Sequence, residues 1–488
     1  MIGFHHGAIG ARAALAAIAT FALLLGACTA PAASPSASFP ASSATPSSAV
    51  SSPSSAPSAS VNPSPSASAL PAACTTVATG LLNPRGITIA ADGTIYVAEA
   101  GTGGTEPDFP TDPVDSPAAS GSPTASGSPT ASGSPAPVGM HGDTGQVTMI
   151  TPDGQQSVLV SGLTSYSFLG ETIGPAGVVV ADDGTIYVSV GGPGPGLAQF
   201  VPAGTAGWVV SVDSAGTVTP LANIAQYERD NNPDPNAIDS NLGGMAMGTD
   251  GLLYVADSGG NNLYSVDPAS GEINVVTVFA GLPSPDGAPN PERGGAADVD
   301  PVPTSVFADP AGGVYVGFLT GGMLWATPGA AKVVLVATDG TVVDVVTGVN
   351  MVTGVAVSDD TVYASELSTS FVAAPPAPGQ LVGAPLGGTP TPLITGLPFP
   401  YGLALAADGR SIFIVINSTG PADVAPNGQV ISCELPAPVG TPAGSPAASA
   451  SPDVSASPEP SASAEPSASA EPSPIESQSP EASPSSSP

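Results

Sequence analysis

The chain has 488 residues, among them 60 glycines and 58 prolines, which are unevenly distributed. Six Lys and Arg residues against 39 Asp and Glu residues give a formal net charge of -33. So few cations cannot neutralise a phosphate backbone, which argues against nucleic-acid binding. The acidic balance fits a soluble exported protein, and it leaves open whether the acids form a solvated surface or attract cations specifically.

The N-terminus predicts export. Arg12 precedes an apolar run over residues 13–25, which is too short for a mature membrane span but suits a signal-peptide core. The run ends in Leu25-Gly26-Ala27-Cys28, which resembles a bacterial lipobox. We expect residues 1–28 to be a lipoprotein signal and Cys28 to be lipidated; the alternative is an ordinary signal peptide cleaved nearby. The protein would then lie on the outer face of the cytoplasmic membrane, or elsewhere outside the cytoplasm, and touch the membrane through its lipid anchor only.

Three tracts are dominated by Ser, Pro and Ala. They cover residues 29–73, about 106–138 and 436–488, and the last is also acidic. Because they contain too little apolar surface to offset chain entropy, we expect them to be disordered, with or without O-linked sugar.

A short hairpin pattern recurs through the remaining core. Residues 83–101, NPRGITIAADGTIYVAEAG, predict two apolar strands joined by an Ala-Asp-Gly turn. Similar segments begin at Ala181, Gly248, Ala308, Val357 and Ala406. In the first five units the hairpin is followed by two further strand-like segments, and a period of about 40 to 60 residues is typical of a propeller.

The sixth unit ends one strand short of this pattern. The missing strand is found at the other end of the core. There the segment CTTVATGLL, which begins at Cys74, is similar to QSVLVSGL, the outer-strand sequence of the first unit. We therefore predict an all-β fold, a six-bladed β-propeller over residues 74–435 that is closed by its N-terminal strand. Closure of this kind protects sheet edges.

Cysteine placement supports this closure. Aligning the last unit with the first places Cys433 on Ile150 and Cys74 on Gln156, which face each other across a turn. Directly opposed strand residues lie within disulfide range, so we predict a Cys74–Cys433 disulfide in the exported protein, with two free thiols as the alternative.

The order of these segments resembles a known group. GLLNPRGITIAADGTIYVAEAGTGG, TGQVTMI, SNLGGMAMGTDGLLYVADSGGNNLYSVDP and VPTSVFADPAGGVYVGFLTG are similar to the ScyD/ScyE family of exported propellers. In fold, the repeat resembles the NHL and SMP-30/gluconolactonase group. The first resemblance implies an exported six-bladed propeller without a defined activity; the second implies a calcium-dependent hydrolase.

Histidine and cysteine chemistry is sparse. The histidines are His5 and His6, in the signal, and His141, beside the central Ser-Pro tract, where we expect a solvated linker residue. No Ser-His-Asp arrangement is therefore expected, nor a zinc or copper cluster.

Oxygen ligands are more promising. The starts of the inner strands and the ends of the second strands meet on one face of a propeller, at the mouth of its central channel. This rule places ten candidates there: Asn83, Arg85, Glu99, Asn241, Asp257, Thr304, Asn350, Glu366, Tyr401 and Asn417. Glu99, Asp257 and Glu366 are candidate calcium ligands. Alternatively, Arg85 pairs with Glu99 or Asp257 and only holds blades together.

The sequence contains two long connections, residues 223–241 and 283–303. Each is expected to be a disordered or packed surface loop, with a binding loop as the alternative. The sequence favours a monomeric, non-catalytic binding or scaffold module for an unknown small molecule or extracellular protein. It names no firm cofactor, calcium being the one candidate. The alternative is a calcium-dependent hydrolase of lactones or sugar-acid esters, as the SMP-30 resemblance implies.

Overall fold

The computed structural model describes residues 70–108, 139–168, 171–192, 194, 201–236, 238–284, 287, 289–290, 293–321, 327–371, 373, 376–419 and 427–436. The predictions for the signal, for lipidation of Cys28 and for nearly all of the three Ser/Pro/Ala tracts lie outside these residues. Among the described residues, no helix is long and apolar enough to cross a membrane.

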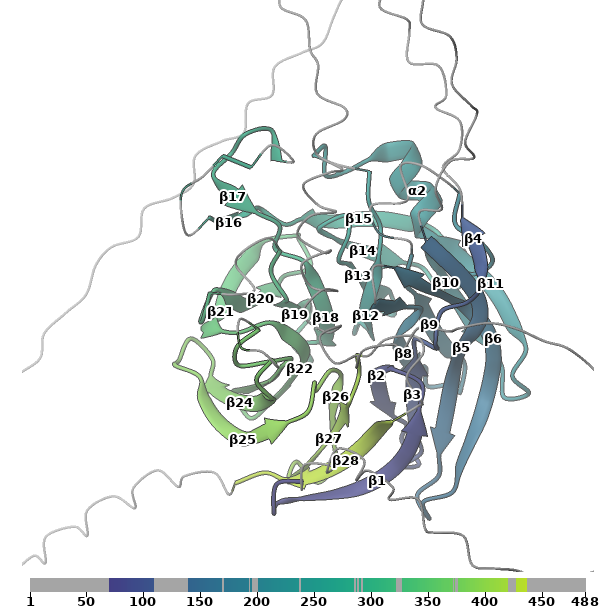
Figure 1. Cartoon of the computed structure of the whole chain (residues 1–488), viewed down its shortest axis with the longest axis vertical. Coiled ribbons are helices and arrows are strands. Elements are labelled where there is room, and N and C mark those ends of the chain that lie inside the picture. Colours follow the sequence, from purple (N-terminus) through teal and green to yellow (C-terminus); the bar gives the residue numbers. More distant parts are fainter. Residues whose placement is uncertain are drawn as a thin grey trace, which may run out of the picture. The chain divides into compact units, whose positions relative to one another are not determined.

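Six antiparallel sheets form the blades of a propeller, as predicted (Figure 1). Blade 1 consists of β2 (Pro84–Ile89), β3 (Ile95–Glu99), β5 (Gly139–Ile150), β6 (Gln156–Phe168) and β7 (Glu171–Ile173), with β4 (Glu106–Asp108) paired to β5. Blade 2 consists of β8 (Pro175–Val180), β9 (Ile186–Val190), β10 (Trp208–Val212) and β11 (Val218–Asn223). Blade 3 consists of β12 (Leu242–Met247), β13 (Leu253–Asp257), β14 (Asn262–Val266) and β15 (Ile273–Val278).

The second half repeats this arrangement. Blade 4 consists of β18 (Pro303–Ala308), β19 (Val314–Phe318), β20 (Ala331–Val336) and β21 (Val342–Val349). Blade 5 consists of β22 (Val352–Ser358), β23 (Thr361–Glu366), β24 (Gly379–Pro385) and β25 (Thr391–Leu397). Blade 6 consists of β26 (Leu403–Leu405), β27 (Ser411–Ile416), β28 (Gly428–Glu434) and β1 (Cys74–Leu81).

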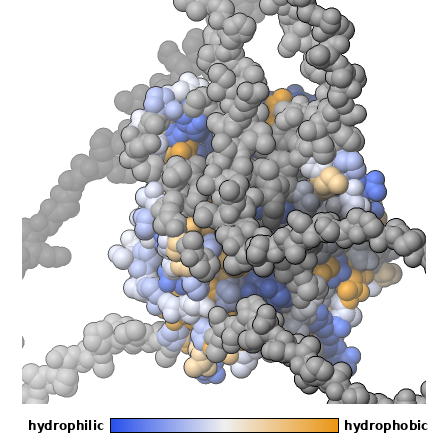
Figure 2. Space-filling model, in the orientation of Figure 1, coloured by the Kyte–Doolittle hydropathy of each residue, from blue (hydrophilic) through white to orange (hydrophobic). Residues whose placement is uncertain are grey.

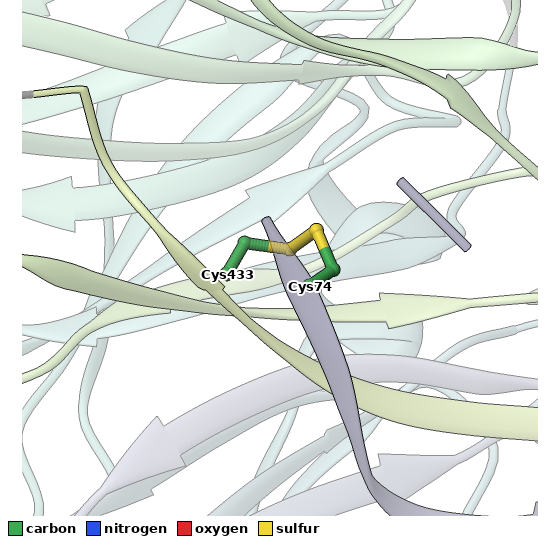
Figure 3. The surroundings of a disulfide bond; sticks show 2 residues. All are labelled: Cys74 and Cys433. Carbon is green, nitrogen blue, oxygen red and sulfur yellow. A yellow bond between two sulfur atoms is a disulfide. The ribbon is translucent and has the colours of Figure 1, made fainter. Parts of the chain in front are cut away.

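The ring closes through blade 6, where the N-terminal strand β1 pairs with the C-terminal strand β28. Cys74 lies directly opposite Cys433 in this pairing, as Ile150 lies opposite Gln156 in blade 1. A disulfide joins the two cysteines, whose Cα atoms are 4.0 Å apart (Figure 3). Both the predicted closing strand and the predicted disulfide are therefore present in the structure.

The hydrophobic core lies between the blades. Eight clusters of buried side chains are found among the described residues, and the six larger ones lie one at each interface of neighbouring blades. At the blade 1–blade 2 interface, for example, Val147 packs with Val188 and Val210, and all three are fully buried. Burial of each such side chain contributes about 1.5 to 3 kcal/mol, so each blade depends on its neighbours for stability.

Small residues let the inner strands approach one another around the axis. These strands contact each other in the order β2, β8, β12, β18, β22, β26, and β26 returns to β2. A Cβ on Gly86 would lie 2.5 Å from the carbonyl oxygen of Ala176, and one on Gly402 would lie 2.3 Å from that of Arg85. Glycine therefore allows close backbone approach here, and it leaves room for a narrow channel.

The connections differ from the sequence expectation in three places. Residues 224–231 of the first long connection form helix α2 (Ile224–Asn231), whose N-cap Asn223 accepts a hydrogen bond from the Gln226 amide at 2.9 Å. The second long connection contains a two-stranded ribbon of β16 (Leu282–Pro283) and β17 (Asp298–Val299). Blade 1 gains β4 and β7, which the repeat does not contain.

His141 is a further correction, because it is not a solvated linker residue. It lies in strand β5, where its backbone pairs with Glu106 and Tyr166. Its ring lies 5.7 Å from the ring of Tyr166. The repeat pattern missed this because the strand extends well beyond the usual blade length, toward the Ser-Pro tract.

On the parts of the described surface that are visible in Figure 2, apolar and hydrophilic residues are interspersed. The most exposed large apolar side chains are valines and one leucine: Val158, Val201, Val278, Val342, Val343 and Leu386. Scattered apolar residues of this kind are normal on a soluble domain.

Candidate functional site

A cavity of about 130 Å³ lies at one end of the central channel. Its walls come from residues just before inner strands, such as Thr172 and Asn241, and from residues just after second strands, such as Ser258 and Leu367. It adjoins a narrower space of about 50 Å³ that all six inner strands line. We refer to the larger space as the channel-mouth cavity. It occupies the face at which the sequence placed the site.

The ten sequence candidates divide into two groups. Four line the channel-mouth cavity: Arg85, Asn241, Thr304 and Tyr401. The other six do not line it, and they make hydrogen bonds within their own blades: Asn83, Glu99, Asp257, Asn350, Glu366 and Asn417.

Arg85 is the cation of the cavity. It follows Pro84 at the start of β2, and its side chain is buried, with the residue 9% exposed. Nη2 donates a hydrogen bond to the carbonyl oxygen of Thr172 at 2.8 Å, and the guanidinium lies 4.8 Å from the centroid of the Tyr401 ring. Among the described residues it pairs with neither Glu99 nor Asp257, so the predicted structural ion pair is not formed.

Thr172 was not predicted. It lies in β7, immediately before blade 2, and it is 2% exposed. Thr172 is one of the residues that line the cavity, and its buried Oγ1 has no hydrogen-bond partner within the described structure. The rule that selected Asn83 takes the residue directly before an inner strand, which in blade 2 is Gly174, so it would not have found Thr172 in the additional strand β7.

The three candidate calcium ligands occupy equivalent places at the ends of β3, β13 and β23. Each carboxylate accepts hydrogen bonds from the turn that precedes its own inner strand. Glu99 accepts from the Leu82 amide at 2.5 Å, and Glu366 accepts from the Asn350 amide at 2.8 Å. All three are at most 1% exposed, and they lie in different blades.

These three carboxylates do not fit one shared calcium site. No group of three His, Cys, Asp or Glu side chains suited to a metal ion occurs among the described residues. Burial raises the pKa of Glu99 and of Asp257, and the hydrogen bonds they accept oppose that rise. The arrangement is that of three turn-capping carboxylates, and calcium binding by the chain stays a prediction.

The remaining asparagines also close turns. Asn83 and Asn417 adopt positive φ angles of 51° and 54°, a conformation that asparagine tolerates better than most residues. Asn83 Nδ2 donates to the Gly101 carbonyl at 2.9 Å. Asn350 Nδ2 donates to Glu366 at 3.0 Å, and its Oδ1 accepts from the Gly329 amide at 2.7 Å.

A second polar cluster, which sequence reasoning missed, lies where α2 packs against blade 3. Glu228 of α2 is fully buried and accepts a hydrogen bond from the Tyr264 hydroxyl at 2.6 Å. Burial, followed by the charges of Asp257 and Asp234, raises the pKa of Glu228 to about 8, against the hydrogen bond from Tyr264. Arg293 bridges to Asp234, Asp298 and Asp300 nearby.

The raised pKa of Glu228 predicts that the protein becomes less stable as pH rises. The unfolded chain loses the Glu228 proton near pH 4.5, whereas the folded protein keeps it to about pH 8. The folded state therefore binds the extra proton between these values, and the free energy of unfolding should fall as pH rises through this window. At about 1.4 kcal/mol per pKa unit this shift corresponds to roughly 5 kcal/mol as an upper figure, and we expect Glu228→Gln to remove several kcal/mol of the decline, because glutamine cannot ionise.

Urea unfolding at pH 5 and pH 8.5 would measure this difference. The exposed Glu272 offers a matched control, since Glu272→Gln should leave the pH dependence unchanged. A Glu228→Gln variant with the wild-type pH dependence would contradict the assignment.

The sequence matches no family model and no curated protein. Among solved structures, a streptogramin B lyase is 11% identical, with a TM-score of 0.37, over 74% of this chain and 97% of its own. A gluconolactonase from Xanthomonas campestris is 12% identical, with a TM-score of 0.37, over 76% and 99%. A putative oxidoreductase (glucose dehydrogenase) from Thermus thermophilus is 13% identical, with a TM-score of 0.41, over 74% and 98%. Similarity this low assigns no activity, and the six-bladed fold rests on the sheets described above.

Proposed function

We propose that the chain is an extracytoplasmic binding module of the ScyD/ScyE type, held to the membrane by lipidated Cys28, which takes a small molecule in the channel-mouth cavity. The sequence-based signal and lipobox support the location. The ligand site is supported by the shape of the propeller, which gathers residues from different blades around one small cavity.

The observation that carries this proposal is the state of Arg85. A buried guanidinium is costly unless its donors are satisfied, and here it faces a cavity without a carboxylate partner among the described residues. A buried arginine with a purely structural role normally pairs with a carboxylate. A cavity-lining arginine held by one carbonyl and one aromatic ring is better suited to meeting a ligand.

Filling the cavity tests the proposal. Ala176 lines both the channel-mouth cavity and the narrower channel, so Ala176→Leu should occupy ligand space. Ala269, exposed in the turn between β14 and β15, provides the control Ala269→Leu. We expect saturation-transfer NMR with a library of small polar molecules to give signals with wild type and Ala269→Leu and to lose them with Ala176→Leu. Binding that survives in Ala176→Leu, or no binding to wild type, would contradict the proposal.

The same proteins discriminate the hydrolase alternative. A lactone panel with added divalent cations should show no turnover if the chain only binds. Turnover by wild type that is lost in Ala176→Leu would replace the binding module with a catalytic function at the same cavity.

A further inference from the structure

Resting on the proposed function, we infer that the ligand of the channel-mouth cavity is a small carboxylate, bound by the Arg85 guanidinium and the Thr172 hydroxyl. Among the described residues that line this cavity, Arg85 has the largest spare hydrogen-bonding capacity, and it is a donor.

Arg85 has most of its donors available. A guanidinium carries five N–H donors and no acceptor. In the described structure it uses one nitrogen, Nη2, on the Thr172 carbonyl. The contact with the Tyr401 ring holds the guanidinium near the ring by a cation–π interaction, without occupying any of its N–H donors in a hydrogen bond. The remaining N–H groups can therefore engage a group with two oxygen acceptors, and a carboxylate matches the fork of a guanidinium.

Thr172 adds a second donor at the same place. Its carbonyl oxygen positions Arg85, while its buried Oγ1 has no partner within the described chain. A hydroxyl left without a partner in a buried position costs free energy, and a ligand oxygen would satisfy it. By contrast, the Thr304 hydroxyl is already engaged, by the carbonyl oxygens of Gly317 at 3.1 Å and Val352 at 2.6 Å.

Glu171 limits the charge of the ligand. It is the one carboxylate among the described cavity-lining residues, and it is exposed at the rim. Its negative charge opposes any anion that approaches Arg85, and more strongly a dianion than a monoanion. The cavity is also small, at about 130 Å³. A compact monocarboxylate fits these limits better than a phosphate ester.

Matched pairs of probes test the inference. Propionate and benzoate would be compared with propionamide and benzamide, which have the same shape without the charge, by competition NMR on the full chain at pH 7. We expect the carboxylates to bind at least tenfold more tightly than their amides. Thr172→Val should weaken carboxylate binding several-fold without loss of folding, because it removes Oγ1 and keeps the carbonyl. Glu171→Gln should strengthen it.

Arg85→Lys keeps a positive charge and loses the planar fork, so it should reduce the preference for carboxylates over amides. Thermal unfolding would verify that each variant is folded. Equal binding of amides and carboxylates by wild type would overturn the carboxylate inference and leave the binding function intact, provided that Ala176→Leu still abolishes binding. Tighter binding of inorganic phosphate than of propionate, or weaker carboxylate binding by Glu171→Gln, would also overturn it.

Discussion

Removing the disulfide is expected to lower the free energy of unfolding by about 4 kcal/mol. The variant is Cys74→Ala with Cys433→Ala. The two cysteines are 359 residues apart in sequence, so the bridge restricts the unfolded chain over nearly the whole core. A chain-entropy estimate gives roughly 6 kcal/mol as an upper figure, and measured values usually fall below it. The bridge also joins β1 to β28, the pair that closes the ring.

Urea unfolding followed by circular dichroism would compare the double variant with wild type. It would also compare wild type with and without a reductant. The reduced protein keeps both sulfur atoms, so its loss of stability reports the covalent link rather than a cavity. The third cysteine supplies a control: Cys28→Ser lies outside the described residues and should not change unfolding of the core. Equal midpoints for oxidised and reduced protein would contradict a closing role for the bridge.

The closure could be predicted because a propeller imposes a strict repeat on its sequence. The sixth unit lacked an outer strand, and the sequence that begins at Cys74 matched the missing strand. The topology of the ring followed from these two incomplete units, one at each end of the core. Register followed too, since a shift of one residue would turn every apolar side chain of the strand to the other face. Alignment of the last unit with the first placed Cys74 opposite Cys433, and the structure has the same register.

Features outside the repeat could not be predicted in this way. Helix α2 and the ribbon of β16 and β17 have no counterpart in other blades, so no comparison within the chain revealed them. Their partly buried charges come together only in three dimensions: Arg293 meets Asp234 across 59 residues of sequence. His141 was misjudged for the same reason, because its strand partner belongs to an extension of blade 1.

For the candidate site, the rule about strand ends selected the end of the channel at which the cavity lies, but not the direction of each side chain. Arg85 and Tyr401 occupy equivalent places before their inner-strand glycines, and both line the cavity. Glu99 and Glu366 also occupy equivalent positions, at the ends of the second strands of their blades. Their carboxylates nevertheless accept hydrogen bonds from turns within those blades and do not line the cavity. Sequence spacing gives the position of a backbone, whereas the local donors decide where a buried carboxylate points.

Asp257 should be the most sensitive of these turn-capping carboxylates. It is 0% exposed, and its Oδ1 accepts from the amides of Asn241 at 2.8 Å and of Gly259 and Gly260 at 3.1 Å, while Oδ2 accepts from the Ser240 hydroxyl at 2.7 Å. Asp257→Ala would leave these four donors without their acceptor. We expect a loss of about 4 kcal/mol in the free energy of unfolding, measured by urea denaturation.

Asp257→Asn separates the hydrogen bonds from the charge. The asparagine Oδ1 can keep all three amide donors, and the Ser240 hydroxyl can rotate to accept from Nδ2, so we expect a loss of only about 1 kcal/mol. Because burial raises the pKa of Asp257 in the folded state, wild-type stability should fall as pH rises from the ordinary pKa of an aspartate to that raised value, and the neutral variant should lack this part of the decline. If Asp257→Asn were instead as damaging as Asp257→Ala, the negative charge itself would be required. A cation would then be the natural partner of this carboxylate. Calorimetric titration with calcium, after a chelator has removed any bound metal, would be carried out on wild type and on Asp257→Asn. Heat of binding that is present in wild type and lost in the variant would identify the cation site.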